Sequence, residues 1–309
     1  MNKTGIISAL QGFQQKSRTS IIESVFSEHE YALNWEITKK CNFSCHYCIN
    51  PPDINDEGAV IIDNRQILQA FRNTQKTWYI NITGGEPFLF PDFIALLSGL
   101  SESNLVSVDT NLSTSNIFEL PSVKNIQNIG AIYASYHYDE RKKHIGGIQN
   151  FIEKVLFLQQ NSIDVIVSLV AYPDSLDDLS GQISFLRNSG IKKITPKLFI
   201  GDHNGKSYPA AYSMEEISNL EQLRTCFEID FLPFDNRTKG RPCYAGNKYF
   251  YMNRFGDLYR CSSVFEKCGN LFRKEISIDR TSRKCTAAIC NCAFEGIFLS
   301  KAKKGIFVF

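Results

Sequence analysis

The chain has 309 residues, of which 43% are hydrophobic and 21% are charged, and its formal net charge is +2. This composition is typical of a globular protein with about two domains, and it excludes a disordered chain and a strongly basic nucleic-acid-binding surface. No apolar run approaches the ~20 residues that a membrane-spanning helix needs, and glutamine and glycine interrupt the N-terminal segment too often for a signal peptide. We therefore expect a cytoplasmic protein.

Strands and helices are predicted to alternate about six times between residues 31 and 200. Strand patterns cover residues 31–37, 77–82, 105–110, 131–137, 164–170 and 193–200, and helix patterns begin at Asp63 and cover 93–100, 148–160 and 175–188, the last capped by Ser175. Such alternation is typical of parallel βαβ units in an α/β fold. It fits an open doubly wound sheet or a partly closed barrel, and the periodicity alone does not distinguish them.

The alternation stops after Gly201. We expect a loop over residues 201–209, a helix that begins with a capping box of Ser213 and Glu216, and a β-hairpin over residues 249–260 with glycine in its turn. The expected domain organisation is a lead-in over residues 1–30, an α/β domain over 31–205, a connecting helix and linker over 206–240, and a smaller α+β domain over 241–309.

Eight of the ten cysteines fall into two groups. The first group is Cys41, Cys45 and Cys48, directly after the first predicted strand, and in a reducing compartment such clusters indicate a metal site. Three thiolates on one loop can bind one face of a cubane iron–sulfur cluster and leave one iron open. Zinc is the alternative metal, but a structural zinc site needs a fourth protein ligand, and His46 between two ligands is expected to point outward.

The first group and a second motif resemble those of the radical S-adenosylmethionine (SAM) superfamily. Cys41-Asn-Phe-Ser-Cys45-His-Tyr-Cys48 has the family's spacing, with aromatic Tyr47 before the third cysteine. Thr83-Gly84-Gly85-Glu86-Pro87, at the end of the second predicted strand, looks like the family's GGEP motif. The resemblance implies a partial (β/α)6 barrel similar to a TIM barrel, and a [4Fe–4S] cluster on the three cysteines.

The resemblance also implies an activity. The cluster would receive an electron from a flavodoxin- or ferredoxin-type donor and cleave SAM to a 5′-deoxyadenosyl radical, which abstracts a hydrogen atom from a substrate. Two glycines allow the backbone to approach a ligand closely, and Glu86 and nearby carbonyls would accept hydrogen bonds from the methionine ammonium. The SAM contacts that we expect are Tyr47, Thr83, Gly84, Gly85, Glu86, Thr110, Asn111, Ser135, His137 and Ser168. Asn111 could instead cap a helix, Ser168 could face a helix, and His137 could face the substrate.

The second cysteine group resembles the SPASM and twitch extensions of radical SAM enzymes, which hold auxiliary iron–sulfur clusters. It comprises Cys243 and Cys261 on the predicted hairpin and, downstream, Cys285, Cys290 and Cys292. Five candidates suffice for one auxiliary [4Fe–4S] cluster, which favours the shorter twitch type. We favour Cys243, Cys261, Cys290 and Cys292 as ligands, with Cys285 replacing one of them or lying beside them. Zinc is the alternative here also. Cys268 is expected to pack in a turn or strand, and Cys226 is expected to be buried.

Two enzymatic functions remain open. The first is oxidation or rearrangement of a small molecule such as a sugar, a cyclitol or an amino-acid derivative. The alternative is a maturase that crosslinks or epimerises a ribosomally made peptide. Such maturases often carry an N-terminal recognition domain, and only about 30 residues precede the first predicted strand here, so we favour a small substrate. A substrate could reach Tyr136, Tyr138, Asp139, Lys197 and Asp202, although ordinary solvated loop positions explain these residues equally well. A zinc-dependent binding module is the non-enzymatic alternative.

Overall fold

The central feature of the fold is a ten-stranded sheet in the order β13-β12-β11-β10-β1-β2-β3-β4-β5-β6. The computed structural model describes residues 30–49, 62–227, 238–288 and 290. From β1 to β6 the strands are parallel and follow in sequence order; they are β1 (Tyr31–Thr38), β2 (Trp78–Gly84), β3 (Leu105–Thr110), β4 (Ile129–Ser135), β5 (Val165–Ala171) and β6 (Ile194–Leu198). A doubly wound sheet would reverse its strand order partway, so the barrel-type prediction is confirmed.

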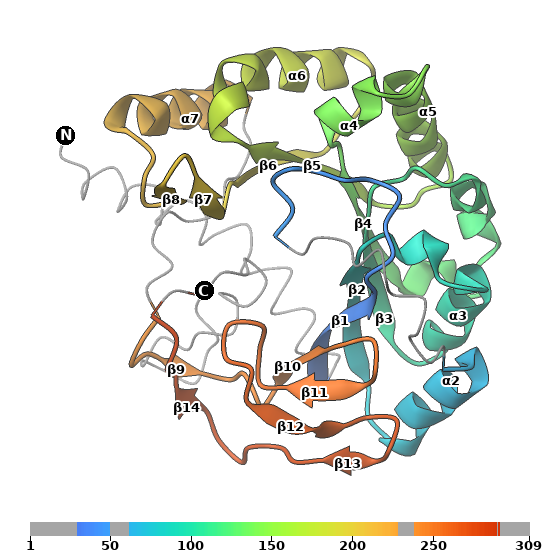
Figure 1. Ribbon diagram of the computed structural model, residues 1–309. Coiled ribbons are helices and arrows are strands. Elements are labelled where there is room, and N and C mark those ends of the chain that lie inside the picture. Colours follow the sequence, from blue (N-terminus) through green and yellow to red (C-terminus); the bar gives the residue numbers. More distant parts are fainter. Residues whose placement is uncertain (1–29, 50–61, 228–237, 289, 291–309) are drawn as a thin grey trace.

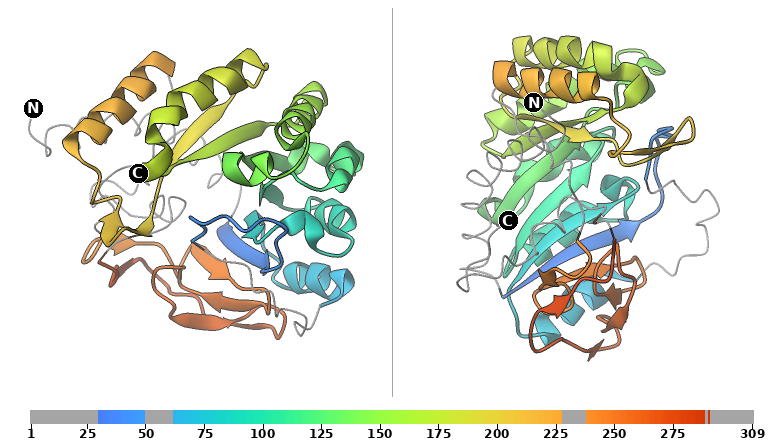
Figure 2. Two further views of the ribbon diagram at one scale, coloured as in Figure 1. Left: turned by 45° about the horizontal axis from the view of Figure 1, so that its top comes forward. Right: turned by 90° about the vertical axis from the view of Figure 1, so that its left-hand side faces the viewer.

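The helices lie on the outer face of the curved sheet, as Figures 1 and 2 show. They are α2 (Asn64–Asn73), α3 (Phe93–Leu100), α4 (Tyr138–Lys142), α5 (Gly147–Gln160), α6 (Leu176–Asn188) and α7 (Met214–Phe227), with the 3-10 turns η2 (Pro87–Leu89), η3 (Ser115–Ser122), η4 (Ile126–Asn128) and η5 (Pro173–Ser175). The predicted capping box of α7 is confirmed, because the Ser213 hydroxyl accepts from the Glu216 N–H at 3.2 Å and the Glu216 carboxylate accepts from the Ser213 N–H.

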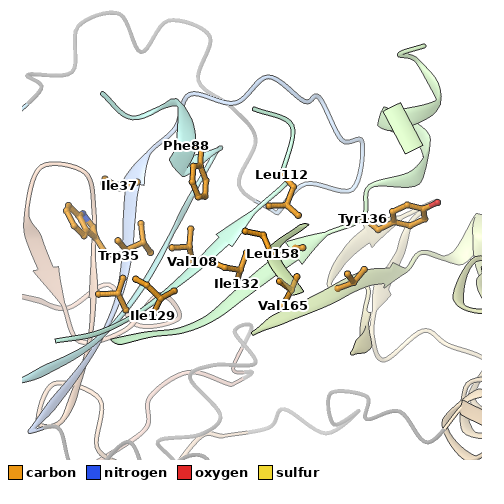
Figure 3. Close-up of a cluster of buried hydrophobic side chains, with 14 of the residues drawn as sticks. Trp35, Ile37, Phe88, Val108, Leu112, Ile129, Ile132, Tyr136, Leu158 and Val165 are labelled. Atoms are coloured by element: carbon orange, nitrogen blue, oxygen red, sulfur yellow. The ribbon is translucent and has the colours of Figure 1, made fainter. Parts of the chain in front are cut away.

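The hydrophobic core lies between the outer face of the sheet and these helices. Alternate residues of each strand point into it, and Figure 3 shows Trp35, Val108, Ile132 and Val165 on the strands with Leu158 of α5 among them. All five are 2% exposed or less. Because side chains alternate along a strand, the residues between them must point to the inner face of the sheet. The outer face is therefore apolar, and the inner face is left for the polar residues of the same strands.

The C-terminal strands extend the same sheet instead of forming a separate one. β10 (Tyr249–Met252) pairs in parallel with β1, and the antiparallel strands β11 (Asp257–Tyr259), β12 (Lys267–Asn270) and β13 (Glu275–Ile276) follow it. The predicted hairpin is confirmed, with Met252 opposite Leu258. Its turn needs Gly256, whose φ is +77° and where a Cβ would lie 2.1 Å from the Phe272 ring. The domain boundary near residue 240 stays a prediction. A further pair, β9 (Pro242–Cys243) and β14 (Arg283–Lys284), lies beside these strands.

Two local predictions were wrong. Residues 201–208 form a small hairpin, β7 (Gly201–His203) and β8 (Lys206–Tyr208), where a loop was expected. Asn204 and Gly205 at its turn both have positive φ, as a two-residue hairpin turn of the Asn-Gly kind requires. Ser175 precedes α6 but makes no capping hydrogen bond, because its hydroxyl donates to the Tyr172 carbonyl at 3.3 Å.

Candidate functional site

The three cysteines of the first group lie together on the loop that follows β1. Cys41 and Cys45 are half-buried and Cys48 is exposed, and the Cys48 N–H donates to the Cys45 carbonyl at 3.0 Å in a tight turn. Burial, Glu140 and the charges of the Cys48 and Cys41 thiolates raise the pKa of Cys45 to about 12. The pKa of Cys41 is raised by burial and then by Glu86 and Cys48. The thiols are thus close enough to repel one another when charged, and a cationic cluster that binds all three would relieve this repulsion. Three soft thiolate ligands on one loop suit an iron–sulfur cluster.

The glycines of the GGEP segment fit against the backbone that leads into the cysteine loop. The Gly85 N–H donates to the Thr38 carbonyl at 2.7 Å, and the Glu86 N–H donates to the Lys40 carbonyl at 2.8 Å. A Cβ on Gly84 would lie 2.2 Å from the Thr38 oxygen, and one on Gly85 would lie 2.3 Å from the Lys40 oxygen. Glycine is required here by the approach of protein backbone, which fixes the start of the cysteine loop against the end of β2.

The Glu86 side chain is fully buried and already hydrogen-bonded within the protein. One carboxylate oxygen accepts from the Phe88 N–H at 3.0 Å and the Thr110 hydroxyl at 2.8 Å, and the other accepts from the Asn111 N–H at 2.7 Å. Burial raises its pKa, opposed by these three donors. The carboxylate therefore ties the end of β3 to the end of β2. The expected contact of Glu86 with the SAM ammonium stays a prediction, and so does the expected SAM contact of Thr83. The Thr110 hydroxyl donates its hydrogen bond to Glu86.

Asn111 faces the cysteine loop. Its amide nitrogen lies 3.8 Å from the Cys41 sulfur and donates to the Asn42 side chain at 3.1 Å, while its oxygen accepts from the Ser113 N–H at 2.8 Å. An amide beside a cluster ligand can orient that ligand and tune the metal. The structure thus brings Asn111 to the first cysteine, and a contact with SAM stays a prediction.

A buried arginine holds the other side of the cysteine loop. Arg141 of α4 is 2% exposed, and its guanidinium lies 5.4 Å from the centre of the Phe43 ring and 4.0 Å from that of Phe151. It donates to the carbonyls of Tyr136, Asn111 and Ser135, the last at 3.1 Å. Burial lowers its pKa to about 9. The guanidinium therefore joins the ends of β3 and β4 to the ring of Phe43, which lies between Cys41 and Cys45 in the sequence.

Two more charged residues that sequence reasoning missed support the same region. Glu140 accepts a hydrogen bond from the Ser44 N–H at 3.3 Å, and Lys154 donates to the Leu112 and Ser113 carbonyls at 3.0 and 2.9 Å. Lys154 is 2% exposed, and burial lowers its pKa to about 8. The burial of Lys154 could have been predicted from the sequence, because it lies three residues after the apolar Phe151 and so on the same face of α5.

An aromatic group surrounds the last part of the cysteine loop. The Tyr47 hydroxyl lies 3.0 Å from Nδ1 of His137, the two rings stack at 5.8 Å, and the Tyr47 and Tyr172 rings are 5.6 Å apart. Burial, Arg141 and Lys197 lower the pKa of His137 to about 3, so this imidazole is neutral at neutral pH. His46 is exposed, as expected. Ser135 and Ser168 are opposite each other on β4 and β5, with hydroxyl oxygens 3.4 Å apart.

The second cysteine group is only partly described. Cys243, Cys261 and Cys285 belong to one cluster with Ala32, Tyr79, Ala245 and Tyr249, near the start of β1. Cys290 is buried, Cys292 lies outside the described residues, and Cys268 packs elsewhere on β12. Cys285 thus accompanies the hairpin cysteines, which makes it a stronger ligand candidate than the spacing indicated. Within the described ranges, no three His, Cys, Asp or Glu side chains are arranged to hold a single metal ion.

Two comparisons rest on sequence. A family model described as the Radical SAM superfamily matches residues 35–180. GTP 3′,8-cyclase of Klebsiella pneumoniae is 32% identical over 100 residues, and that of Cronobacter sakazakii is 31% identical over 102 residues. Each match covers 30% of this chain and 30% of the relative, so the similarity spans less than a third of either protein.

Solved structures show the same fold at low identity. SuiB of Streptococcus suis bound to S-adenosylmethionine has a TM-score of 0.57 and 14% identity, over 80% of this chain and 64% of SuiB. The enzyme anSMEcpe with bound AdoMet also has a TM-score of 0.57 and 14% identity, over 78% of each chain. The partial barrel is thus shared with proteins that bind SAM. In the part of this chain that the structure describes, no helix is both long and apolar enough to cross a bilayer.

Proposed function

Because residues 35–180 form a radical SAM superfamily domain, we propose that this enzyme binds a [4Fe–4S] cluster on Cys41, Cys45 and Cys48 and cleaves SAM there. When bound, the cluster and SAM would supply a 5′-deoxyadenosyl radical, which takes a hydrogen atom from a substrate carbon. The observation that carries this proposal is the loop itself. Its three thiols lie on one loop and interact electrostatically, and the loop is fixed on one side by the GGEP segment and on the other by Arg141.

The chain's own residues hold this loop and exclude water from behind it. Glu86 links the ends of β2 and β3, Arg141 links β3, β4 and the Phe43 ring, and Asn111 contacts the Cys41 sulfur. Because the Glu86 oxygens already accept three hydrogen bonds, we assign the acceptors for the methionine ammonium to backbone carbonyls near Gly84 and Gly85. Glu86 then acts by keeping these carbonyls in place.

We further propose an auxiliary [4Fe–4S] cluster in the C-terminal extension. Cys243 and Cys261 are buried in one cluster, partly buried Cys285 packs against it, and Cys290 is also buried, so these four are the ligands that we favour. Thiolates in an apolar setting suit such a cluster. Cys292, which lies outside the described residues, is the substitute for any one of them.

The substrate that we propose is a small molecule. The curated relatives at 31–32% identity are named for GTP, whereas SuiB, with which a precursor peptide has been crystallised, shares 14% identity and indicates the fold alone. The inner face of the barrel also carries a row of polar side chains, including Asn34, Asn81 and Asp109. Such groups suit a compact polar substrate.

The test is formation of 5′-deoxyadenosine by anaerobically reconstituted protein with SAM and a reductant. We expect the wild type to form it even without substrate, and the Cys45→Ala variant to form none. Cys268→Ala is the matched control and should keep full activity, because Cys268 on β12 packs outside the cluster that contains Cys243, Cys261 and Cys285. A Cys45→Ala variant as active as the control would refute the proposal.

A further inference from the structure

A row of polar side chains on the inner face of the barrel extends from β1 through Asn81 of β2 to β3 and β6. Asn34 on β1, Asn81 on β2 and Asp109 on β3 form one chain of hydrogen bonds, in which the Asn81 nitrogen lies 3.1 Å from Asn34 Oδ1 and 2.8 Å from Asp109 Oδ2. Lys197, on β6, lies 3.8 Å from Asp109 Oδ1. The strands β4 and β5 separate β3 from β6, so this last contact spans the concave side of the sheet.

One hydrogen-bonding group of the Asn81 side chain has no partner among the residues that the structure describes. The side chain is 4% exposed, and its Oδ1 atom is buried and accepts no hydrogen bond from any described residue. The orientation of the amide is fixed by its neighbour, because an ionised carboxylate only accepts, and so the Asn81 nitrogen must face Asp109. The group left over is therefore an acceptor. A buried polar atom of this kind is uncommon in proteins and calls for a donor from elsewhere.

The charged pair beside Asn81 is open enough to meet a ligand. The side chains of Asp109 and Lys197 are 27% and 37% exposed, and their 3.8 Å separation is longer than a direct hydrogen bond. By contrast, Glu36 on the same face is 6% exposed and accepts from the Tyr251 hydroxyl at 3.0 Å. Of these two carboxylates on the inner face, Glu36 is therefore closed to a ligand and Asp109 is accessible.

We infer that Asn81 and Asp109 form a substrate subsite that takes neighbouring hydroxyl or ammonium groups of a small molecule, and that the ligand displaces Lys197 from Asp109. A donor on the ligand would satisfy Asn81 Oδ1, and a second donor would bind the Asp109 carboxylate in place of Lys197. Several acceptors within one patch favour a molecule with donors on adjacent carbons, such as a polyol or an amino sugar. This inference rests on the proposed function, since the subsite lies on the inner face of the same barrel.

The test is binding of glucosamine and myo-inositol, which share hydroxyl donors while only glucosamine carries an ammonium. Affinity is measured by saturation-transfer NMR on reconstituted protein, and unfolding curves check that each variant folds. Asp109→Asn should weaken glucosamine about tenfold, because a charged hydrogen bond is lost. Lys197→Met should tighten glucosamine several-fold, because the competitor for Asp109 is gone. Asp164→Asn is the matched control. Asp164 is not part of this row, and its carboxylate lies 2.7 Å from the Lys193 ammonium.

The opposite shifts of the two variants identify a binding site, since a merely structural pair would lower stability in both and leave affinity unchanged. If only glucosamine binds, the subsite recognises an ammonium group. If both probes bind, it recognises hydroxyl groups. No saturable binding of either probe, or an Asp109→Asn variant that binds like the control, overturns the subsite.

The same samples are assayed for 5′-deoxyadenosine. Wild type that forms it but binds neither probe overturns the subsite alone. Protein that binds the probes and forms none supports the subsite and counts against the proposed function.

Discussion

Replacing Glu86 with glutamine is expected to destabilise the fold at the point where the cysteine loop is fixed. Glutamine keeps one acceptor oxygen, which can still serve the Phe88 N–H and the Thr110 hydroxyl, but its amide N–H₂ must then face the Asn111 N–H. One charge-assisted bond is lost and a buried donor is left without an acceptor, which costs about 1.5–3 kcal/mol. Burial raises the pKa of Glu86 because it disfavours the charged carboxylate. A neutral glutamine avoids this desolvation penalty, so we expect the net loss in the free energy of unfolding to be about 2 kcal/mol.

The loss is measured as the change in free energy of unfolding from urea titration of the apoprotein. Glu119→Gln is the control, because Glu119 is exposed and should change stability by less than about 0.5 kcal/mol. SAM affinity is measured on the reconstituted variants and should fall with Glu86→Gln, since the carbonyls near Gly84 lose their support. A Glu86→Gln variant as stable as Glu119→Gln would refute the structural role assigned to this carboxylate. Unchanged SAM affinity in a destabilised variant would show that Glu86 acts on the fold alone.

Three further predictions follow from single positions. Gly85→Ala should lower iron incorporation, because its Cβ would lie 2.3 Å from the Lys40 oxygen. Gly181→Ala, at an exposed position of α6 where a Cβ meets nothing within 4 Å, should stabilise the protein by about 0.5–1 kcal/mol and incorporate iron normally. The pKa of His137 is about 3 in the folded protein and 6.5 when the side chain is unperturbed. As the pH falls below 6.5, the unfolded state therefore binds a proton that the folded state does not, and the free energy of unfolding decreases. Between pH 7.5 and 5 the wild type should lose about 2 kcal/mol from this source, a loss that His137→Phe should abolish in urea titrations at the two pH values. Cys261→Ala should reduce iron from about eight to about four per chain, and iron unchanged at eight would rule out an auxiliary site there.

The sequence predicted those parts of the fold that depend on local pattern. Alternation of apolar residues placed the strands of the barrel to within about two residues at most ends, and Ser213 with Glu216 identified the start of α7 because their side chains bond each other. The hairpin over 201–208 was missed although Asn204-Gly205 signals such a turn, because its strands are three residues long and carry little apolar pattern.

Long-range contacts could not be predicted from the sequence. The parallel pairing of β10 with β1 joins residues more than 200 positions apart, and nothing in the local pattern of Tyr249–Met252 selects β1 as its partner. Likewise, the cysteine motif predicted a metal site, but not that Arg141 supports the Phe43 ring. The pair Asp109 and Lys197 meets only when the sheet curves, which depends on the whole barrel.

The most direct test of the account is the electron paramagnetic resonance spectrum of the reduced protein with and without SAM. A variant with Cys243, Cys261 and Cys285 replaced by alanine is used, so that only the cluster on the loop after β1 contributes. The account predicts a [4Fe–4S]⁺ signal that changes shape when SAM is added, because the cluster keeps one iron open for it. A signal that is identical with and without SAM, or no cluster signal at all, would contradict the account.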